Sequence, residues 1–160
     1  MDVIADTSPL NYLVLIRTIE VLPALYGAIV VPPAVVRELR DASAPEIVRR
    51  WAESTPVWLS VAPPPPIDEG LRCLDSGERE AIAAAKFSGH EVLLLMDDAR
   101  GRAEAERRAI RTTGTLGVLV AASRKGLLDL GTALEALQRT NFRISPKLVS
   151  QLLAAERTGT

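Results

Sequence analysis

Acidic side chains follow two apolar runs that are typical of buried strands. Asp6 ends "DVIAD", and Asp97 and Asp98 end "HEVLLLMDD". In an open parallel sheet, ligands bind beyond the carboxyl ends of the strands, near the point where the strand order reverses. If these two strands are neighbours, their carboxylates meet at one edge of the sheet. Each group also has a simpler explanation, because Asp6 could cap the next helix and the later pair could be a cap and a solvent-exposed carboxylate.

Two predicted helix N-terminal regions add glutamates to this set. Glu38 lies in "VPPAVVREL", and Glu78 and Glu80 lie in "SGEREAI". Glu38 is flanked by arginines, which is typical of a solvated helix face. Glu78 follows Asp75 at the spacing of a capping box, and Glu80 is compatible with an exposed position. The sequence therefore offers several carboxylates whose role depends on the fold.

Carboxylates that share a pocket repel one another and raise one another's pKa, so such a cluster is costly unless a cation occupies it. Mg²⁺ and Mn²⁺ favour oxygen ligands. Metals held by carboxylates activate water and neutralise charge on a phosphodiester. The pattern is therefore compatible with a metal-dependent nuclease.

Other catalytic chemistries find little support. The only histidine, His90, precedes a strand in "SGHEV", which disfavours a Ser-His-Asp triad. The only cysteine, Cys73, excludes an internal disulfide and makes a cysteine-based zinc site implausible. "TGTLG" lacks the glycine pattern and the lysine of nucleotide-binding loops.

The chain is expected to form a single α/β domain over residues 1–160. Its length of 160 residues, 48% hydrophobic and 24% charged, suits one folded domain. Strand and helix signals alternate, which predicts a mostly parallel sheet. We expect strands near 2–6, 28–32, 57–62 and 90–98, a turn at 112–117, and C-terminal helices near 131–156. Neither a signal peptide nor a membrane-spanning run is evident, so a cytoplasmic protein is expected.

The net charge of −1 gives no indication of a nucleic-acid partner, but several arginines are concentrated in one segment. A helix predicted after "MDD" is rich in them. They could be a solvated face, since glutamates are interleaved, or could contact phosphate groups. The arginines of this segment are Arg100, Arg102, Arg107, Arg108 and Arg111.

Five segments in order resemble PIN-domain proteins, specifically the branch related to VapC-type toxins that carries a G-E-x-E-A-I helix. They are "IADTS", "VPPAVVREL", "LDSGEREAIAAA", "LLLMDDARGR" and "TGTLGVLVAASRKGLL", and they span about residues 2–128. The resemblance implies a three-layer α/β/α fold around a parallel sheet. It also implies that acidic residues bind Mg²⁺ or Mn²⁺ and that the protein cuts RNA.

The family pattern assigns roles to particular acidic residues. Asp6 matches the aspartate after the first strand, and Glu38 matches the glutamate of the helix after the second strand. The third acidic position falls in "SGEREAI", where the pattern favours Glu78 over Glu80. Here the chain departs from the commonest toxins, which have aspartate at this helix position.

The fourth acidic position falls in "MDD". The family pattern T-x-D aligns Met96 with the threonine, which selects Asp98, with Asp97 as the second choice. Ser8 resembles a family hydroxyl near the metal, although with Pro9 it also reads as the start of a helix, Ser8 being the N-cap. Arg100 and Thr115 are candidate substrate contacts, and Thr115 is also expected to cap the helix that follows.

Three functions follow as hypotheses. The first is a ribonuclease that is the toxin of a toxin-antitoxin pair, with RNA as substrate, an antitoxin protein as partner, and a homodimer as its assembly. The second is a catalytically degenerate PIN fold that binds RNA or protein. The third, a receiver-like phosphorylation domain, is disfavoured because its acidic pair should stand near the start of the chain.

Overall fold

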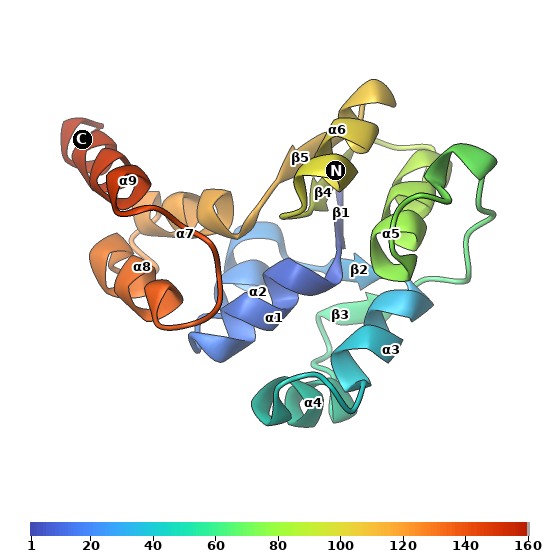
Figure 1. Ribbon diagram of the computed structural model, residues 1–160, viewed down its shortest axis with the longest axis horizontal. Coiled ribbons are helices and arrows are strands. Elements are labelled where there is room, and N and C mark those ends of the chain that lie inside the picture. The colour runs from blue at the N-terminus through green and yellow to red at the C-terminus, as the bar shows by residue number, and fades with distance from the viewer. Residues whose placement is uncertain (160) are drawn as a thin grey trace.

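The computed structural model describes residues 1–159, and its strands form one parallel sheet (Figure 1). The five strands lie in the order β3-β2-β1-β4-β5, with every neighbouring pair parallel. This confirms the predicted α/β class. The strands are β1 (Asp2–Ala5), β2 (Ile29–Val31), β3 (Leu59–Val61), β4 (Val92–Leu95) and β5 (Arg111–Thr113).

The turn expected at 112–117 is wrong. Residues 111–113 form β5, an edge strand, which pairs with β4 in the register Leu95↔Thr113. The N–H of Met96 extends this pairing by donating to the carbonyl of Thr113 at 2.8 Å. β5 is only three residues long and carries no apolar run, so its β-branched threonines were the one local strand signal.

Helices connect the strands and cover both faces of the sheet. A short 3-10 helix, η1 (Glu69–Leu71), lies before α5. The α-helices are α1 (Thr7–Leu15), α2 (Val21–Tyr26), α3 (Pro33–Arg40), α4 (Glu46–Glu53), α5 (Ser76–Phe87), α6 (Ala99–Arg107), α7 (Thr115–Arg124), α8 (Leu130–Gln138) and α9 (Pro146–Thr158).

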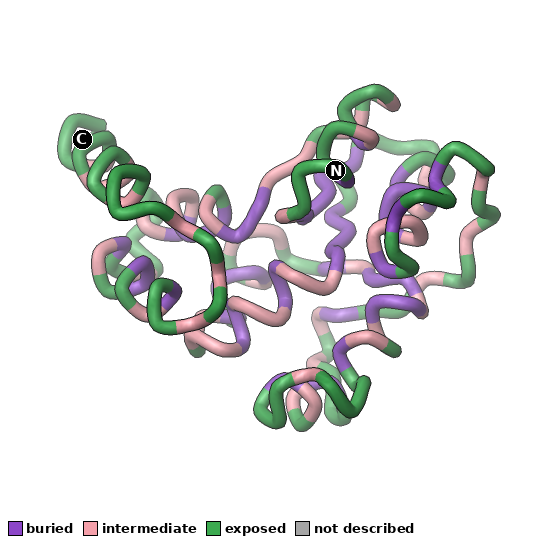
Figure 2. The backbone as a smooth tube through the Cα atoms, viewed as in Figure 1, coloured by how far each residue is buried: buried purple, intermediate pink, exposed green. Residues whose placement is uncertain are grey.

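Alternation along the central strands divides the core into two layers. Val3 and Ala5 of β1 face a cluster built with α1, α2, α3, α4, α7 and α8. Ile4, between them, faces a second cluster built with α5 and α6. Successive strand side chains point to opposite faces, so a sheet buried on both sides needs apolar residues at every position. Figure 2 shows this buried centre, and the three-layer α/β/α arrangement is as predicted.

Helix α1 begins two residues earlier than the sequence suggested. Asp6 is in the N-cap position, with φ −79° and ψ 172°, and Ser8 is the second residue of the helix. The prediction that Ser8 is the N-cap is therefore wrong. The N–H of Asp6 donates to the Leu95 carbonyl at 2.9 Å, so the chain stays in the sheet through Asp6 and turns into the helix directly afterwards.

The C-terminal helices α8 and α9 pack against α7, at one end of the molecule in Figure 1. Buried leucines of α8 join the main core, whereas α9 has no buried residue. None of the helices within residues 1–159 has both the length and the apolar character that crossing a bilayer requires.

Truncating the centre of the sheet should cost far more stability than truncating its edge. Leu94 in β4 is fully buried, so Leu94→Ala should lower the free energy of unfolding by about 2–5 kcal/mol. Val61 on edge strand β3 is 52% exposed, and Val61→Ala should change it by about 0.5 kcal/mol or less. Urea denaturation of both variants measures the difference, and equal losses would contradict the described layering.

Candidate metal centre

The strand order reverses between β1 and β4, and acidic residues follow both strands. β2 and β3 lie on one side of the β1–β4 pair, and β5 lies on the other side. Ala5 pairs with Leu95, so the chain leaves both strands at the same edge of the sheet. β1 and β4 are therefore neighbours, which is the condition under which acidic residues at their ends share one edge, and these residues leave the sheet at its topological switch point.

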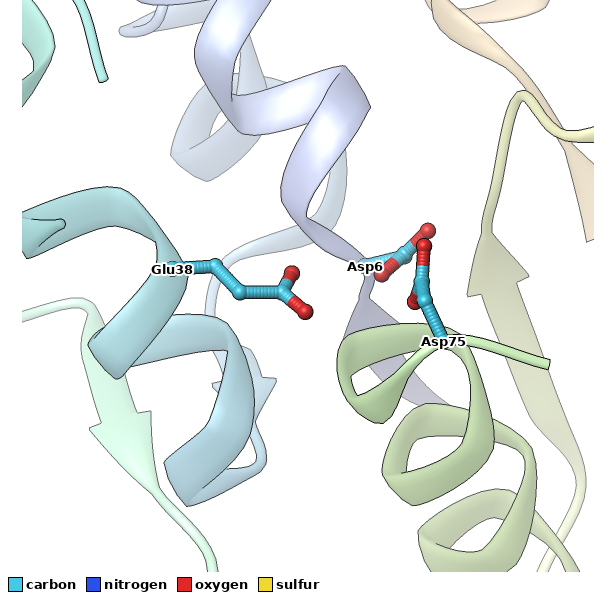
Figure 3. Close-up of side chains that lie close together, drawn as sticks. All are labelled: Asp6, Glu38 and Asp75. Carbon is cyan, nitrogen blue, oxygen red and sulfur yellow. The ribbon is translucent and has the colours of Figure 1, made fainter. Parts of the chain in front are cut away.

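Three carboxylates meet at this edge (Figure 3). Asp6 follows β1, Glu38 reaches across from α3, and Asp75 precedes α5. One ligand oxygen from each lies within 4.8 Å of the other two. Such a group of hard oxygen donors suits a divalent cation such as Mg²⁺ or Mn²⁺.

Asp6 is the most deeply buried member of the cluster. Its residue is 4% exposed, and its Oδ1 atom has no hydrogen-bond partner among the described residues. Although Asp6 is in the N-cap position, its side chain makes no capping hydrogen bond. Burial raises the pKa of this carboxyl well above its ordinary value; a hydrogen bond from the Thr7 backbone opposes the rise, and the charges of Asp75, Glu78 and Glu38 add to it. A buried, unpartnered carboxylate oxygen among like charges is the environment that a bound cation stabilises.

Glu38 is oriented by groups from two other helices. The Thr7 hydroxyl donates to its Oε2, and the N–H of Gly77 donates to its Oε1 at 2.8 Å. A side chain at Gly77 has no room, since its Cβ would lie 2.9 Å from Glu38 Cδ and 3.0 Å from Asp6 Oδ1. The glycine of "SGEREAI" therefore lets the start of α5 approach both carboxylates.

The carboxylate of Glu80 has partners that do not belong to the acidic cluster. Its carboxylate accepts the N–H of Ala34 at 2.8 Å, in the first turn of α3, and lies 3.4 Å from Arg37. Glu38 of α3 in turn accepts the N–H of Gly77 in the first turn of α5. The two helices thus exchange glutamates, each satisfying a free N–H of the other. We conclude that Glu80 holds α3 against α5.

Asp75 and Glu78 form the predicted cap of α5. The Asp75 side chain accepts the Glu78 N–H at 2.9 Å. Burial raises the pKa of Glu78 to about 7, with the charges of Asp75 and Asp98 adding to the effect. Glu78 is thus within electrostatic reach of the cluster. Asp75 was not predicted to be a site residue, because its capping role already explained its presence in the sequence.

The two aspartates after β4 have separate partners. Asp98 caps α6 by accepting the Gly101 N–H at 2.8 Å. Asp97 accepts both the N–H and the hydroxyl of Thr115, each at 2.7 Å. The prediction that Thr115 caps α7 is wrong, since Gly114 is in the N-cap position and Thr115 begins the helix. Burial raises the pKa of Asp97, although the bonds from Thr115 and the charge of Arg102 oppose the rise.

Three other residues of the sequence pattern have surroundings of their own. Met96 is fully buried in the α5–α6 layer, so it cannot replace a threonine hydroxyl at the site. Ser8 is half-buried, and it is the neighbouring Thr7 whose hydroxyl reaches Glu38. Arg100 is exposed and lines a cavity with Cys73 and Leu74.

A family model described as PIN domain matches residues 2–157, nearly the whole chain. No curated protein and no solved structure matches this chain.

Adding one methyl group at Gly77 should weaken metal binding. Gly77→Ala would place Cβ against Glu38 and Asp6, so we expect at least about a tenfold loss of Mn²⁺ affinity by calorimetry, about 1.4 kcal/mol. Gly131 is a matched control, because it is also the second residue of a helix and its Cβ would meet nothing closer than 3.4 Å. Mn²⁺ affinity that is equal in both variants would contradict the described site.

The metal-free protein should become less stable as pH rises toward neutrality. The pKa of Glu78 is raised from 4.5 to about 7, so the folded state binds more protons than the unfolded state between these values. The unfolding free energy then falls from about pH 4.5 to 7. Thermal melts in the presence of a chelator should show a melting temperature that decreases over this pH range. The decrease should be smaller in Glu78→Gln. An identical pH profile in the variant would be the opposing result.

Proposed function

Because the chain belongs to the PIN-domain family, we propose that it is a metal-dependent endoribonuclease whose centre is built on Asp6, Glu38 and Asp75. The observation that carries this proposal is the buried Oδ1 of Asp6, which has no hydrogen-bond partner within residues 1–159. Glu78 and Asp98 complete the acidic set, since the charge of Glu78 acts on Asp6 and that of Asp98 acts on Glu78.

The residues present fit Mg²⁺ or Mn²⁺. Asp6, Glu38 and Asp75 would hold the ion through carboxylate oxygens, the donors that both metals prefer. When bound, such an ion lowers the pKa of its water and neutralises charge on a phosphodiester.

The chain's own groups prepare this centre in three ways. Thr7 and the Gly77 N–H fix the orientation of the Glu38 carboxylate. The sheet edge buries Asp6, which limits competition from water for its free oxygen. Glu78, with a pKa of about 7, can hold a proton near neutral pH and so relieve repulsion while the cluster is empty of cations. Together these features pre-organise negative charge for a cation.

We further propose that the enzyme is the toxin of a toxin-antitoxin pair, like the VapC-related proteins that its "SGEREAI" helix resembles. An acidic cluster at a sheet edge is open to inhibition by a partner that lays a basic side chain across it. Such an antitoxin would compete with the metal for the same carboxylates.

Removing the central ligand should abolish cleavage. Asp6→Asn keeps the shape of the side chain and removes its charge, so we expect the rate of single-stranded RNA cleavage with Mn²⁺ to fall at least about 100-fold, since even groups that only support metal ligands are worth about 10–100-fold. Gel analysis of a mixed-sequence, end-labelled RNA measures the rate. Glu53→Gln, at the exposed end of α4, is the control and should cut like the wild type.

Equal cleavage by wild type and Asp6→Asn would show that a contaminating nuclease acts and would overturn the proposal. Wild-type protein that binds the RNA without cutting it would instead favour the degenerate binding module.

A further inference from the structure

The arginine-rich segment divides into paired and unpaired side chains. Arg107 and Arg108 form ion pairs with Glu104, and Arg111 forms one with Glu91. Arg108 also pairs with Asp68, the residue before η1. The charges of these three arginines are therefore already paired with acidic side chains of the protein itself. Arg100 and Arg102, in contrast, are exposed and form no ion pair within residues 1–159.

Arg102 lines a cavity of about 390 Å³ beyond the ends of β4 and β5. A second exposed arginine, Arg143, lines the same cavity from the loop between α8 and α9, and it has no ion pair in the described part of the chain either. The cavity also touches Asp97, so it adjoins the acidic edge of the sheet.

The loop that carries Arg143 is anchored to α1. Tyr12 donates its hydroxyl hydrogen to Asn141 Oδ1 at 2.8 Å, and its ring packs edge-to-face on Phe142 with centroids 4.9 Å apart. Phe142 is half-buried and lines the cavity beside Arg143. This loop is therefore held at the cavity by two specific contacts.

The acidic residue of the cavity makes no direct ion pair with the arginines in the described part of the chain. Both carboxylate oxygens of Asp97 already accept hydrogen bonds from Thr115. Arg102 acts on Asp97 only through its charge, without a direct ion pair among residues 1–159. Leu116 and Gly117, in the first turn of α7, also line the cavity, and N–H groups at such positions have no partner within their own helix. The cavity thus gathers positive charge and hydrogen-bond donors beside a negatively charged edge.

We propose that this cavity binds one nucleotide of the RNA strand at the same edge of the sheet as the metal centre, with Arg102 and Arg143 holding its phosphate and the Phe142 ring contacting its base. The inference rests on the proposed function and extends it to a substrate subsite. Arginine suits phosphate because its planar guanidinium donates two parallel hydrogen bonds, and an aromatic ring stacks on any base. The subsite would hold the strand without reading its sequence.

The test measures RNA binding and cleavage separately. Fluorescence anisotropy in chelator reports the affinity of wild type, Arg102→Gln, Arg143→Gln and the double variant for a labelled single-stranded RNA. Arg124→Gln is the matched control, since Arg124 is exposed at the opposite end of α7. We expect each subsite variant to weaken binding by about tenfold. Each should also flatten the slope of log affinity against log salt by about 0.7, the value of one phosphate contact on a single strand.

The outcomes separate this subsite from the nuclease proposal. Binding that depends on Arg102 and Arg143 supports the subsite, whether or not the RNA is cut in Mn²⁺. Wild-type cleavage together with variant affinities equal to that of Arg124→Gln would overturn the subsite and leave the nuclease proposal standing. Wild-type protein that neither binds nor cuts RNA would overturn both.

Discussion

The buried carboxylate of Asp6 is the constraint on which the rest of the structure depends. Burying a charge without a partner is costly, and placing Glu38 and Asp75 beside it increases that cost. A fold selected for stability alone would give Asp6 Oδ1 a hydrogen-bond donor, as it gives Asp97 the N–H and hydroxyl of Thr115. The energetic cost of the cluster is therefore best explained by a cation that binds there.

The fold concentrates these acidic groups through a small number of local devices. The parallel sheet directs the chain out of β1 and β4 at the same edge. Glu38 and Glu80 tie α3 and α5 together by each accepting an N–H from the start of the other helix. Gly77 allows the start of α5 to approach without a side chain. These contacts orient the carboxylates without a bound ligand, which reduces the ordering that metal binding would require.

The α/β architecture could be predicted from the sequence because the long apolar runs and the helix signals are local features. Acidic residues could be placed after the two apolar runs that form β1 and β4, and the sheet order shows that these strands are neighbours, as a shared acidic edge requires. β5 was missed because a three-residue edge strand leaves almost no pattern in the sequence. Ser8 was mistaken for the N-cap of α1 because the backbone pairing beyond Ala5 is not visible in the sequence. Asp75 was overlooked for another reason: one residue can cap a helix and face a site, and the first role concealed the second. Which glutamate of "SGEREAI" faces Asp6 depends on how α5 packs against α3, which periodicity alone could not decide.

The most direct test of this account is a crystal structure of the protein grown with saturating Mn²⁺ and measured at an energy where manganese scatters anomalously. The account predicts an anomalous peak bounded by Asp6, Glu38 and Asp75, with Asp6 Oδ1 as one of the ligands. A structure in which Asp6 Oδ1 contacts no ion while Mn²⁺ binds elsewhere, or does not bind at all, would contradict it.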